Sequence, residues 1–154
     1  MQREITAACE LRHITEKQFA VCGDTLREID RVMTELDSVP GARSLIHSDM
    51  SLGNIIRTPS GLAPIDFSLA GWGYRAQECG MIVSNYESDN CQRSVCEGYA
   101  RASGVEVDKH HLDAFLSMSV LLFISSQHGR FHGEEWFGEV IDHWCDGCFA
   151  RTIG

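Results

Sequence analysis

The sequence predicts a mainly α-helical domain of the α+β class, in which a small β-hairpin is inserted between helices. Over most of the chain, apolar residues recur at intervals of three or four, which is the period of a helix with one buried face. Around residues 54–65 this period stops, and two β-prone segments flank a turn that contains Pro59 and Gly61. The length of 154 residues and the apolar content of 44% fit a single domain, residues 1–154.

The N-terminal segment 3–38 is predicted to form a short helix followed by a long one. Thr15 stands before a turn of polar helix formers and is a typical N-cap residue, so the long helix should begin there. Pro40 and Gly41 should end it, because proline cannot continue a helix. The expected buried stripe consists of Phe19, Cys22, Leu26, Ile29, Val32, Met33 and Leu36.

Short extended segments follow the long helix. Residues 44–46 form a brief β-prone run, and residues 54–57 and 62–65 are the expected strands of the hairpin. The segment 67–75 is predicted to be a loop because it contains two glycines.

The remainder of the chain is predicted to be helical at 76–85, 88–103, 108–128 and 134–151. Gly104 is a candidate C-cap and Asp108 a candidate N-cap for the helix that follows it. Gly129 and Gly133 should bracket a turn. The longest apolar run, 115–125, is too short for the roughly 20 residues of a membrane span and indicates a buried core helix.

The charge of the chain limits its partners. A net charge of −9, from 22 acidic and 13 basic residues, argues against nucleic-acid binding and against docking on anionic membranes. It is compatible with a small cationic substrate. The N-terminal residues are polar and contain no apolar signal segment, and the number of cysteines, seven, is odd. We therefore expect a cytoplasmic protein with free thiols.

A loop and the hairpin carry the residues with the clearest chemistry. Residues 47–54 read His-x-Asp-x-x-x-x-Asn, and Ile-Asp-Phe follows the hairpin at 65–67. A carboxylate on a rigid loop, here Asp49, can orient an attacking hydroxyl and accept its proton. Asn54 and Asp66 offer the hard oxygen ligands that Mg²⁺ binds together with phosphates. Because the strands of a hairpin lie side by side, we expect Asn54 and Asp66 to be close neighbours.

These two motifs resemble the catalytic and metal-binding motifs of the aminoglycoside phosphotransferase and choline kinase family, which has a protein-kinase-like fold. The resemblance implies that Asp49 is the catalytic residue and that Asn54 and Asp66 bind Mg²⁺. It also implies ATP or GTP as phosphate donor and a hydroxyl of a small molecule as acceptor. We expect His47 to brace the loop by hydrogen bonding, and Ser48 to support it.

The chain departs from the family pattern at three points. Ser48 stands where the family usually has glycine, and Glu78 stands near a usual aspartate. The segment before Ser44 is predicted to be helical, whereas the family has a glycine-rich, β-rich lobe that clamps the nucleotide. We therefore expect the chain to correspond to a kinase-like C-terminal lobe, with the N-terminal lobe absent. Such a lobe should expose an apolar surface and form a homodimer or bind a separate N-terminal-lobe partner.

Other residues are weaker candidates for a site. Glu134 and Glu135 are candidates for binding a cationic substrate, since the corresponding family region has that role. Trp72 is a candidate for substrate binding because it lies just beyond the metal-binding segment. His128 and His132 are four residues apart, but the glycines beside them should end the helix, so we expect surface or capping roles for both.

Three functions remain open at this point. The first is an ATP-dependent phosphotransferase acting on a small-molecule hydroxyl. The second is a non-catalytic kinase-like remnant that binds a ligand or partner. The third is a thiol or metal protein built around Cys145 and Cys148, which form a lone CxxC pair.

Overall fold

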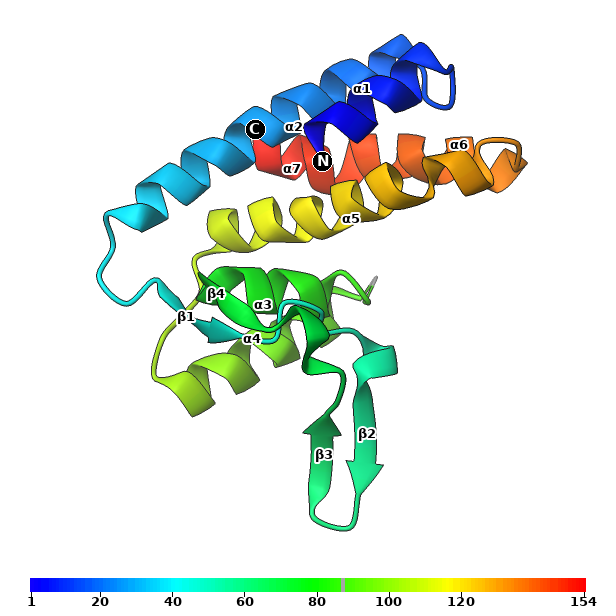
Figure 1. The fold of residues 1–154 in the computed structure, drawn as a ribbon. Coiled ribbons are helices and arrows are strands. Elements are labelled where there is room, and N and C mark those ends of the chain that lie inside the picture. Colours follow the sequence, from blue (N-terminus) through cyan, green and yellow to red (C-terminus); the bar gives the residue numbers. More distant parts are fainter. Residues whose placement is uncertain (87) are drawn as a thin grey trace.

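Helix α5 (Lys109–Phe131) runs through the middle of the molecule, and the other elements lie on its two sides (Figure 1). The computed structural model describes residues 1–86 and 88–154. One side of α5 carries helices α1 (Gln2–Glu10), α2 (Glu16–Asp37), α6 (Glu135–Trp144) and α7 (Ala150–Ile153). The other side carries the described strands together with α3 (Arg75–Val83) and α4 (Asp89–Ser103). The predicted class, α+β and mainly α, is confirmed.

The central position of α5 follows from its sequence. The carboxylate of Asp108 accepts hydrogen bonds from the backbone N–H groups of His110 (2.8 Å) and His111 (3.2 Å), and so caps the first turn. The apolar run that follows is fully buried at Phe115 and Leu121. Each such side chain contributes about 1.5–3 kcal/mol to folding. The predicted N-cap and buried core helix are confirmed, and none of the described helices is long and apolar enough to cross a membrane.

Helix α2 begins at a capping box formed by Thr15 and Gln18. The sequence predicts Thr15 as the N-cap but not the role of Gln18. The Thr15 hydroxyl accepts a hydrogen bond from the Gln18 backbone (3.2 Å), and the Gln18 side chain accepts one from the Thr15 backbone (2.8 Å). The amide group of Gln18 also donates to Asp142 on α6 (2.9 Å), so the cap joins two helices. The residues of α2 that are fully or almost fully buried include Cys22, Ile29, Val32 and Leu36.

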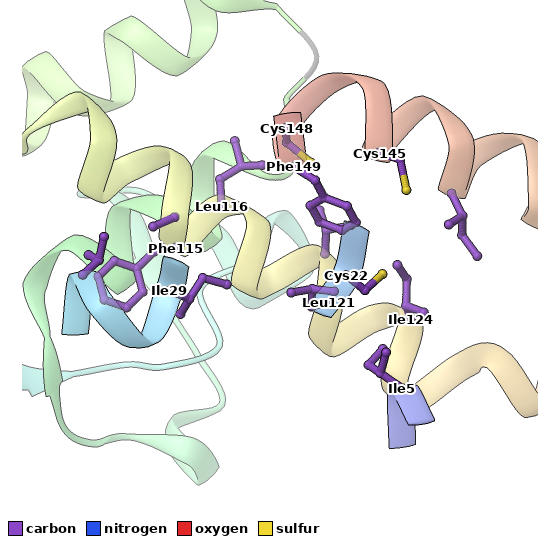
Figure 2. Packing of buried hydrophobic residues seen from close by; sticks show 14 of the residues in the cluster. Ile5, Cys22, Ile29, Phe115, Leu116, Leu121, Ile124, Cys145, Cys148 and Phe149 are labelled. Carbon is purple, nitrogen blue, oxygen red and sulfur yellow. The ribbon is translucent and has the colours of Figure 1, made fainter. Parts of the chain in front are cut away.

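The C-terminal segment is not one regular helix, as the prediction for 134–151 assumed. Between α6 and α7 the chain forms a π-helix, η3 (Cys145–Phe149). A π-turn holds one more residue than an α-turn. Figure 2 shows Phe149 pointing from this turn toward Cys22 and Leu121, and all three side chains are fully buried. The packing of Phe149 gives the physical reason for the correction.

The strands form two separate antiparallel pairs. Strand β2 (Ile55–Thr58) pairs with β3 (Gly61–Pro64), with Ile55 opposite Pro64, and the predicted hairpin is confirmed. Strand β1 (Arg43–Ile46) pairs with β4 (Gly71–Tyr74), with Ile46 opposite Gly71. In Figure 1 the β2–β3 hairpin projects away from the helices, whereas β1 and β4 lie beside α3.

The predicted loop at 67–75 is wrong in part. It contains a 3₁₀ turn, η2 (Phe67–Leu69), followed by strand β4. Glycine in this strand has a packing reason, because a Cβ at Gly73 would lie only 2.5 Å from the end of the Ile46 side chain. Gly73 therefore allows close packing of the Ile46 side chain against β4 rather than marking an irregular loop.

A polar cluster joins the end of α2 to both strands of the β1–β4 pair. The Asp37 carboxylate accepts hydrogen bonds from Tyr74 (2.7 Å) and from Arg43 (2.6 Å). Both bonds lower the pKa of Asp37, and the bond from Tyr74 has the larger effect. The Arg43 guanidinium also lies over the Tyr74 ring, 4.3 Å from its centroid. The cluster holds the start of β1 and the end of β4 in place.

Helix α5 is longer than predicted. It continues through Gly129 to Phe131, although glycine in a helix costs about 1 kcal/mol relative to alanine. The aromatic contacts of Phe131 offset this cost, because its ring lies 6.2 Å from Phe137 and 5.1 Å from Trp136, centroid to centroid. Tertiary packing thus outweighs the local preference of Gly129.

Helix α3 approaches α5 most closely at Gly80. A Cβ at this position would lie 2.6 Å from the backbone carbonyl carbon and the Cβ of Phe115, and 2.8 Å from the backbone nitrogen of Leu116. No L side chain fits there unless the two helices separate.

We expect Gly80→Ala to lower the free energy of unfolding by about 1–3 kcal/mol, because overpacking must push α3 away from α5. The measurement is urea unfolding followed by circular dichroism. Gly129→Ala is the matched control, since nothing lies within 4 Å of its added methyl group, and this variant should gain up to about 1 kcal/mol. Equal effects of the two substitutions would contradict the close approach.

Candidate active site

The loop between β1 and β2 is fixed by a side chain from α3. One carboxylate oxygen of Glu78 accepts a hydrogen bond from the His47 backbone N–H (3.0 Å), and the other accepts one from the Ser48 backbone N–H (3.1 Å). Successive N–H groups that point the same way form a concave site for an anion, and here the anion is part of the chain. Glu78 therefore sets the path of the loop as it leaves β1.

Ser48 has a left-handed backbone, with a φ of 64°. Residues other than glycine adopt this conformation at a cost of about 1–3 kcal/mol, and such residues cluster at functional sites. The two hydrogen bonds to Glu78 hold the backbone nitrogens of His47 and of Ser48 itself. The strain at Ser48 and the contact with Glu78 thus belong to one local structure.

Asp49 is held by Asn54. The Asn54 amide nitrogen donates to the backbone carbonyl of Asp49 (2.8 Å) and to its carboxylate (2.9 Å). Both bonds use the nitrogen, so the amide oxygen of Asn54 faces away from Asp49. The short 3₁₀ turn η1 (Leu52–Asn54) closes the loop and delivers Asn54 to the start of β2.

The hairpin brings its two ends together, as the sequence predicts. The backbone N–H of Ile65 donates to the backbone carbonyl of Asn54 at 2.9 Å, which continues the pairing of Ile55 with Pro64 by one step. Asp66 is the next residue. The amide that holds Asp49 and the carboxylate of Asp66 are therefore on neighbouring segments at the open end of the hairpin.

Asp66 is exposed and has a left-handed backbone, with a φ of 60°. Its carboxylate accepts a hydrogen bond from the backbone N–H of Ser68 at 3.3 Å and caps the η2 turn. Hydrogen bonds from Ser68 lower the pKa of Asp66, and the bond from its side chain has a larger effect than the one from its backbone. The nearby His47 lowers this pKa as well. Asp66 is therefore ionised at neutral pH.

His47 lies below this surface, with only 4% of its side chain exposed. Its Nε2–H donates to the backbone carbonyl of Ile65 (2.8 Å), and its ring lies 4.6 Å from that of Phe67. The Nδ1 atom is buried and has no hydrogen-bond partner among the described residues. His47 thus connects the loop to the segment on either side of Asp66, which is the geometry of a brace.

The donor set fits Mg²⁺. This ion prefers oxygen ligands, takes one or two carboxylates from the protein and keeps other positions for phosphates and water. Asp66 supplies an ionised carboxylate, and Asn54 supplies an amide oxygen that takes no part in its hydrogen bonds to Asp49. In the described part of the chain, no three or more His, Cys, Asp or Glu residues are arranged as a metal site, so this set relies on its amide.

The structure does not bring every predicted residue to the loop. Trp72 is 71% exposed on β4, opposite Leu45 in the β1–β4 pair. Glu134 and Glu135 are exposed at the start of α6, which lies on the other side of α5 from the strands (Figure 1). A cavity of about 330 Å³ next to the loop is lined instead by Leu45, His47, Met50, Pro64, Phe67 and Glu78, among others.

The thiols of the CxxC pair are buried in the core beside Cys22. Cys22, Cys145 and Cys148 are buried, and all seven cysteines are free. Burial raises the pKa of Cys22 to about 12 and that of Cys145 to about 11, so neither is a thiolate at neutral pH. The CxxC pair therefore belongs to the packed π-helix.

The expected surface role of His128 is wrong. Because α5 continues past Gly129, His128 lies inside the helix, is only 7% exposed, and pairs with His13. His132 is exposed at the C-cap of α5, as the capping role predicts.

Loop, hairpin and oxygen donors together define a phosphotransferase-like domain, and comparison with known families agrees. Residues 1–115 match the model of the phosphotransferase enzyme family. The match covers most of the chain, and the protein belongs to this family. The resemblance to aminoglycoside phosphotransferases and choline kinases is consistent with it. No curated protein and no solved structure matches the chain.

Sequence reasoning overlooked Glu78 as a part of the site. From the sequence, Glu78 stands out only because the family has an aspartate near this position, and that gives no reason to expect a contact with the loop. A carboxylate in the first turn of a helix is usually attributed to the helix dipole. Its partners lie about 30 residues earlier (30 and 31), so no local pattern reveals the contact.

We expect Glu78→Gln to lower the free energy of unfolding by roughly 1–3 kcal/mol, because an amide offers one acceptor where the two N–H groups need two. Faster hydrogen exchange at the amides of His47 and Ser48 should accompany the loss. Glu139→Gln, at an exposed position of α6, is the matched control and should change neither quantity. Unchanged exchange at these two amides in Glu78→Gln would refute the role of Glu78.

Thiol chemistry offers a second test. In the native protein at pH 8, Ellman's reagent should label the exposed Cys91 rapidly, while Cys22, Cys145 and Cys148 should react only after unfolding in urea. Cys91→Ser should remove the rapid phase. Rapid labelling of the CxxC pair in the folded protein would contradict its burial.

Proposed function

We propose that the protein is the catalytic-loop lobe of an ATP-dependent phosphotransferase that acts on a hydroxyl group of a small molecule. The observation that carries the proposal is the hydrogen bond from Asn54 to the Asp49 carboxylate, at the end of the hairpin that also presents Asp66. This arrangement supplies a proton acceptor and two metal-binding oxygens on adjoining segments. Membership in the phosphotransferase enzyme family supports the same reaction class.

Each residue has a distinct task in this mechanism. The Asp49 carboxylate accepts a hydrogen bond from the substrate hydroxyl, orients it for attack and takes its proton as the new bond to phosphorus forms. Asn54 holds Asp49 in place through its amide nitrogen. The oxygens of Asn54 and Asp66 would hold Mg²⁺, which would neutralise the charge of the phosphates. ATP or GTP would supply the phosphoryl group and leave as the nucleoside diphosphate.

Two residues keep this geometry rigid. Glu78 fixes the loop from below through two backbone N–H groups, and His47 ties the loop to the segment that carries Asp66. A misplacement of about 1 Å can cost a factor of about 100 in rate, so these contacts matter for turnover as well as for folding.

The acceptor and the partners belong to the proposal as well. A net charge of −9 favours a cationic acceptor such as an amino alcohol or an aminoglycoside. A nucleotide-clamping lobe or a second copy of the chain would cover the apolar side chains that are exposed around the hairpin and the β1–β4 pair, namely Leu45, Leu52, Ile56, Leu62, Phe67, Leu69 and Trp72. The same exposed surface would serve a non-catalytic binding domain, which is the second candidate function.

Transfer of labelled phosphate from ATP to a panel of amino alcohols and aminoglycosides tests the proposal. With Mg²⁺ present, we expect turnover that falls by about 10²–10⁴-fold in Asp49→Asn, because general-base catalysis contributes that much. Asp30→Asn, an exposed position on α2, should leave the rate unchanged.

Calorimetry with Mg²⁺ and ATP separates the two candidate functions. Nucleotide binding that needs Asn54 and Asp66 supports the phosphotransferase. If neither binding nor turnover occurs, with or without a nucleotide-clamping lobe added in trans, the non-catalytic binding domain is the better description.

A further inference from the structure

We propose that His13, His128 and His132 form an acid-sensitive clasp that fastens the α1–α2 turn to the end of α5 and releases it at mildly acidic pH. The Nδ1 atoms of His13 and His128 lie 2.8 Å apart. The ring of His132 stacks on that of His13, with 3.8 Å between centroids and 17° between planes. Three imidazoles from two distant segments thus meet at one point.

The contact between the two Nδ1 atoms constrains the protonation of the pair. A hydrogen bond at this distance needs one N–H and one lone pair, so one ring must donate and the other must accept. The bond therefore survives when one of the two rings is charged. It breaks when both are charged, because two N–H groups then face each other and two positive charges repel.

The surroundings of the three imidazoles do not compensate a positive charge on them. In the described part of the chain, no carboxylate forms an ion pair with any of the three imidazoles (the ion pairs of histidine there are His110 with Glu28 and His111 with Glu35). His13 lines a cavity whose charged lining groups are Glu10, Arg12 and Glu16 from its own segment and Asp142 from α6. Asp142 already accepts a hydrogen bond from Gln18.

The direction of the pH effect follows from these contacts. Partial burial lowers the pKa of His13 below its ordinary value of 6.5. The neighbouring His132 and His128 lower it further, each by less than burial does. The unfolded or opened chain therefore binds more protons than the closed one, and the closed state loses stability as pH falls below about 6.5. Carboxylates such as Glu28, whose pKa is lowered from 4.5, take up protons only at lower pH.

The α1–α2 turn is well suited to open locally. Arg12 has a left-handed backbone, with a φ of 58°, so the closed turn contains strain that opening relieves. Directly after His13, the buried side chain of Ile14 (4% exposed) contributes to keeping the turn closed. The turn lies at the end of the molecule where α5 finishes, across α5 from the strands (Figure 1). Opening there should leave the loop around Asp49 unchanged.

Hydrogen exchange of the full chain at pH 7.0 and pH 5.5, corrected for the chemical exchange rate, tests the clasp. The amides of residues 9–18 should exchange at least about 10-fold faster at pH 5.5, while those of β1 and α3 should not. In His13→Gln, which cannot take up a proton, exchange at 9–18 should be the same at both pH values. His143→Gln, an exposed histidine on α6, is the matched control and should retain the pH dependence.

A second measurement covers the case in which His13→Gln is already open at pH 7. Nitrogen NMR of the imidazoles in the unmodified protein should show His13 becoming charged over the same pH range in which residues 9–18 lose protection. Equal protection at pH 7.0 and pH 5.5 in the unmodified protein would overturn the clasp. Charging of both His13 and His128 without loss of protection would overturn it as well.

Discussion

The close approach of α3 to α5 at Gly80 is the constraint on which the candidate site depends. With no side chain at Gly80, α3 rests directly on the backbone at Phe115, in the most buried part of the molecule. Two residues earlier on the same helix, Glu78 reaches the loop that carries Asp49. A short helix therefore transmits the rigidity of the hydrophobic core to the candidate site, which itself buries few apolar side chains.

Local signals account for the parts of the fold that the sequence predicts well. Thr15 and Asp108 cap helices through groups within three residues, Gly104 ends α4 with a φ of 70°, and the β2–β3 hairpin needs only its own turn. The errors in β4 and α5 involve partners that lie outside the segment itself. Strand β4 exists because of β1, and α5 passes Gly129 because aromatic side chains pack beyond it. Neither partner can be found from the periodicity of a single segment.

The same distinction applies to the site. Asp49, Asn54 and Asp66 could be placed from motif spacing, because a hairpin is a local structure that brings its own ends together. Glu78 and the pairing of His13 with His128 depend on which helices pack together, and the sequence alone does not specify that packing. Glu134 and Glu135 are candidates on charge and family resemblance alone; they lie at the start of α6, across α5 from the strands, and their role in substrate binding stays a prediction.

Because of the π-turn η3, the orientation of α7 depends on the number of residues between α6 and α7. One residue of helix corresponds to about 100° of rotation, so removing a residue between Cys145 and Phe149 would turn α7 away from its present face. Thr152 would then lose its buried contact with Ser117 (2.9 Å), and Arg151 would lose its ion pair with Asp113 (3.4 Å). Among related chains, the number of residues in this segment should therefore vary as little as its buried side chains Cys145, Cys148 and Phe149.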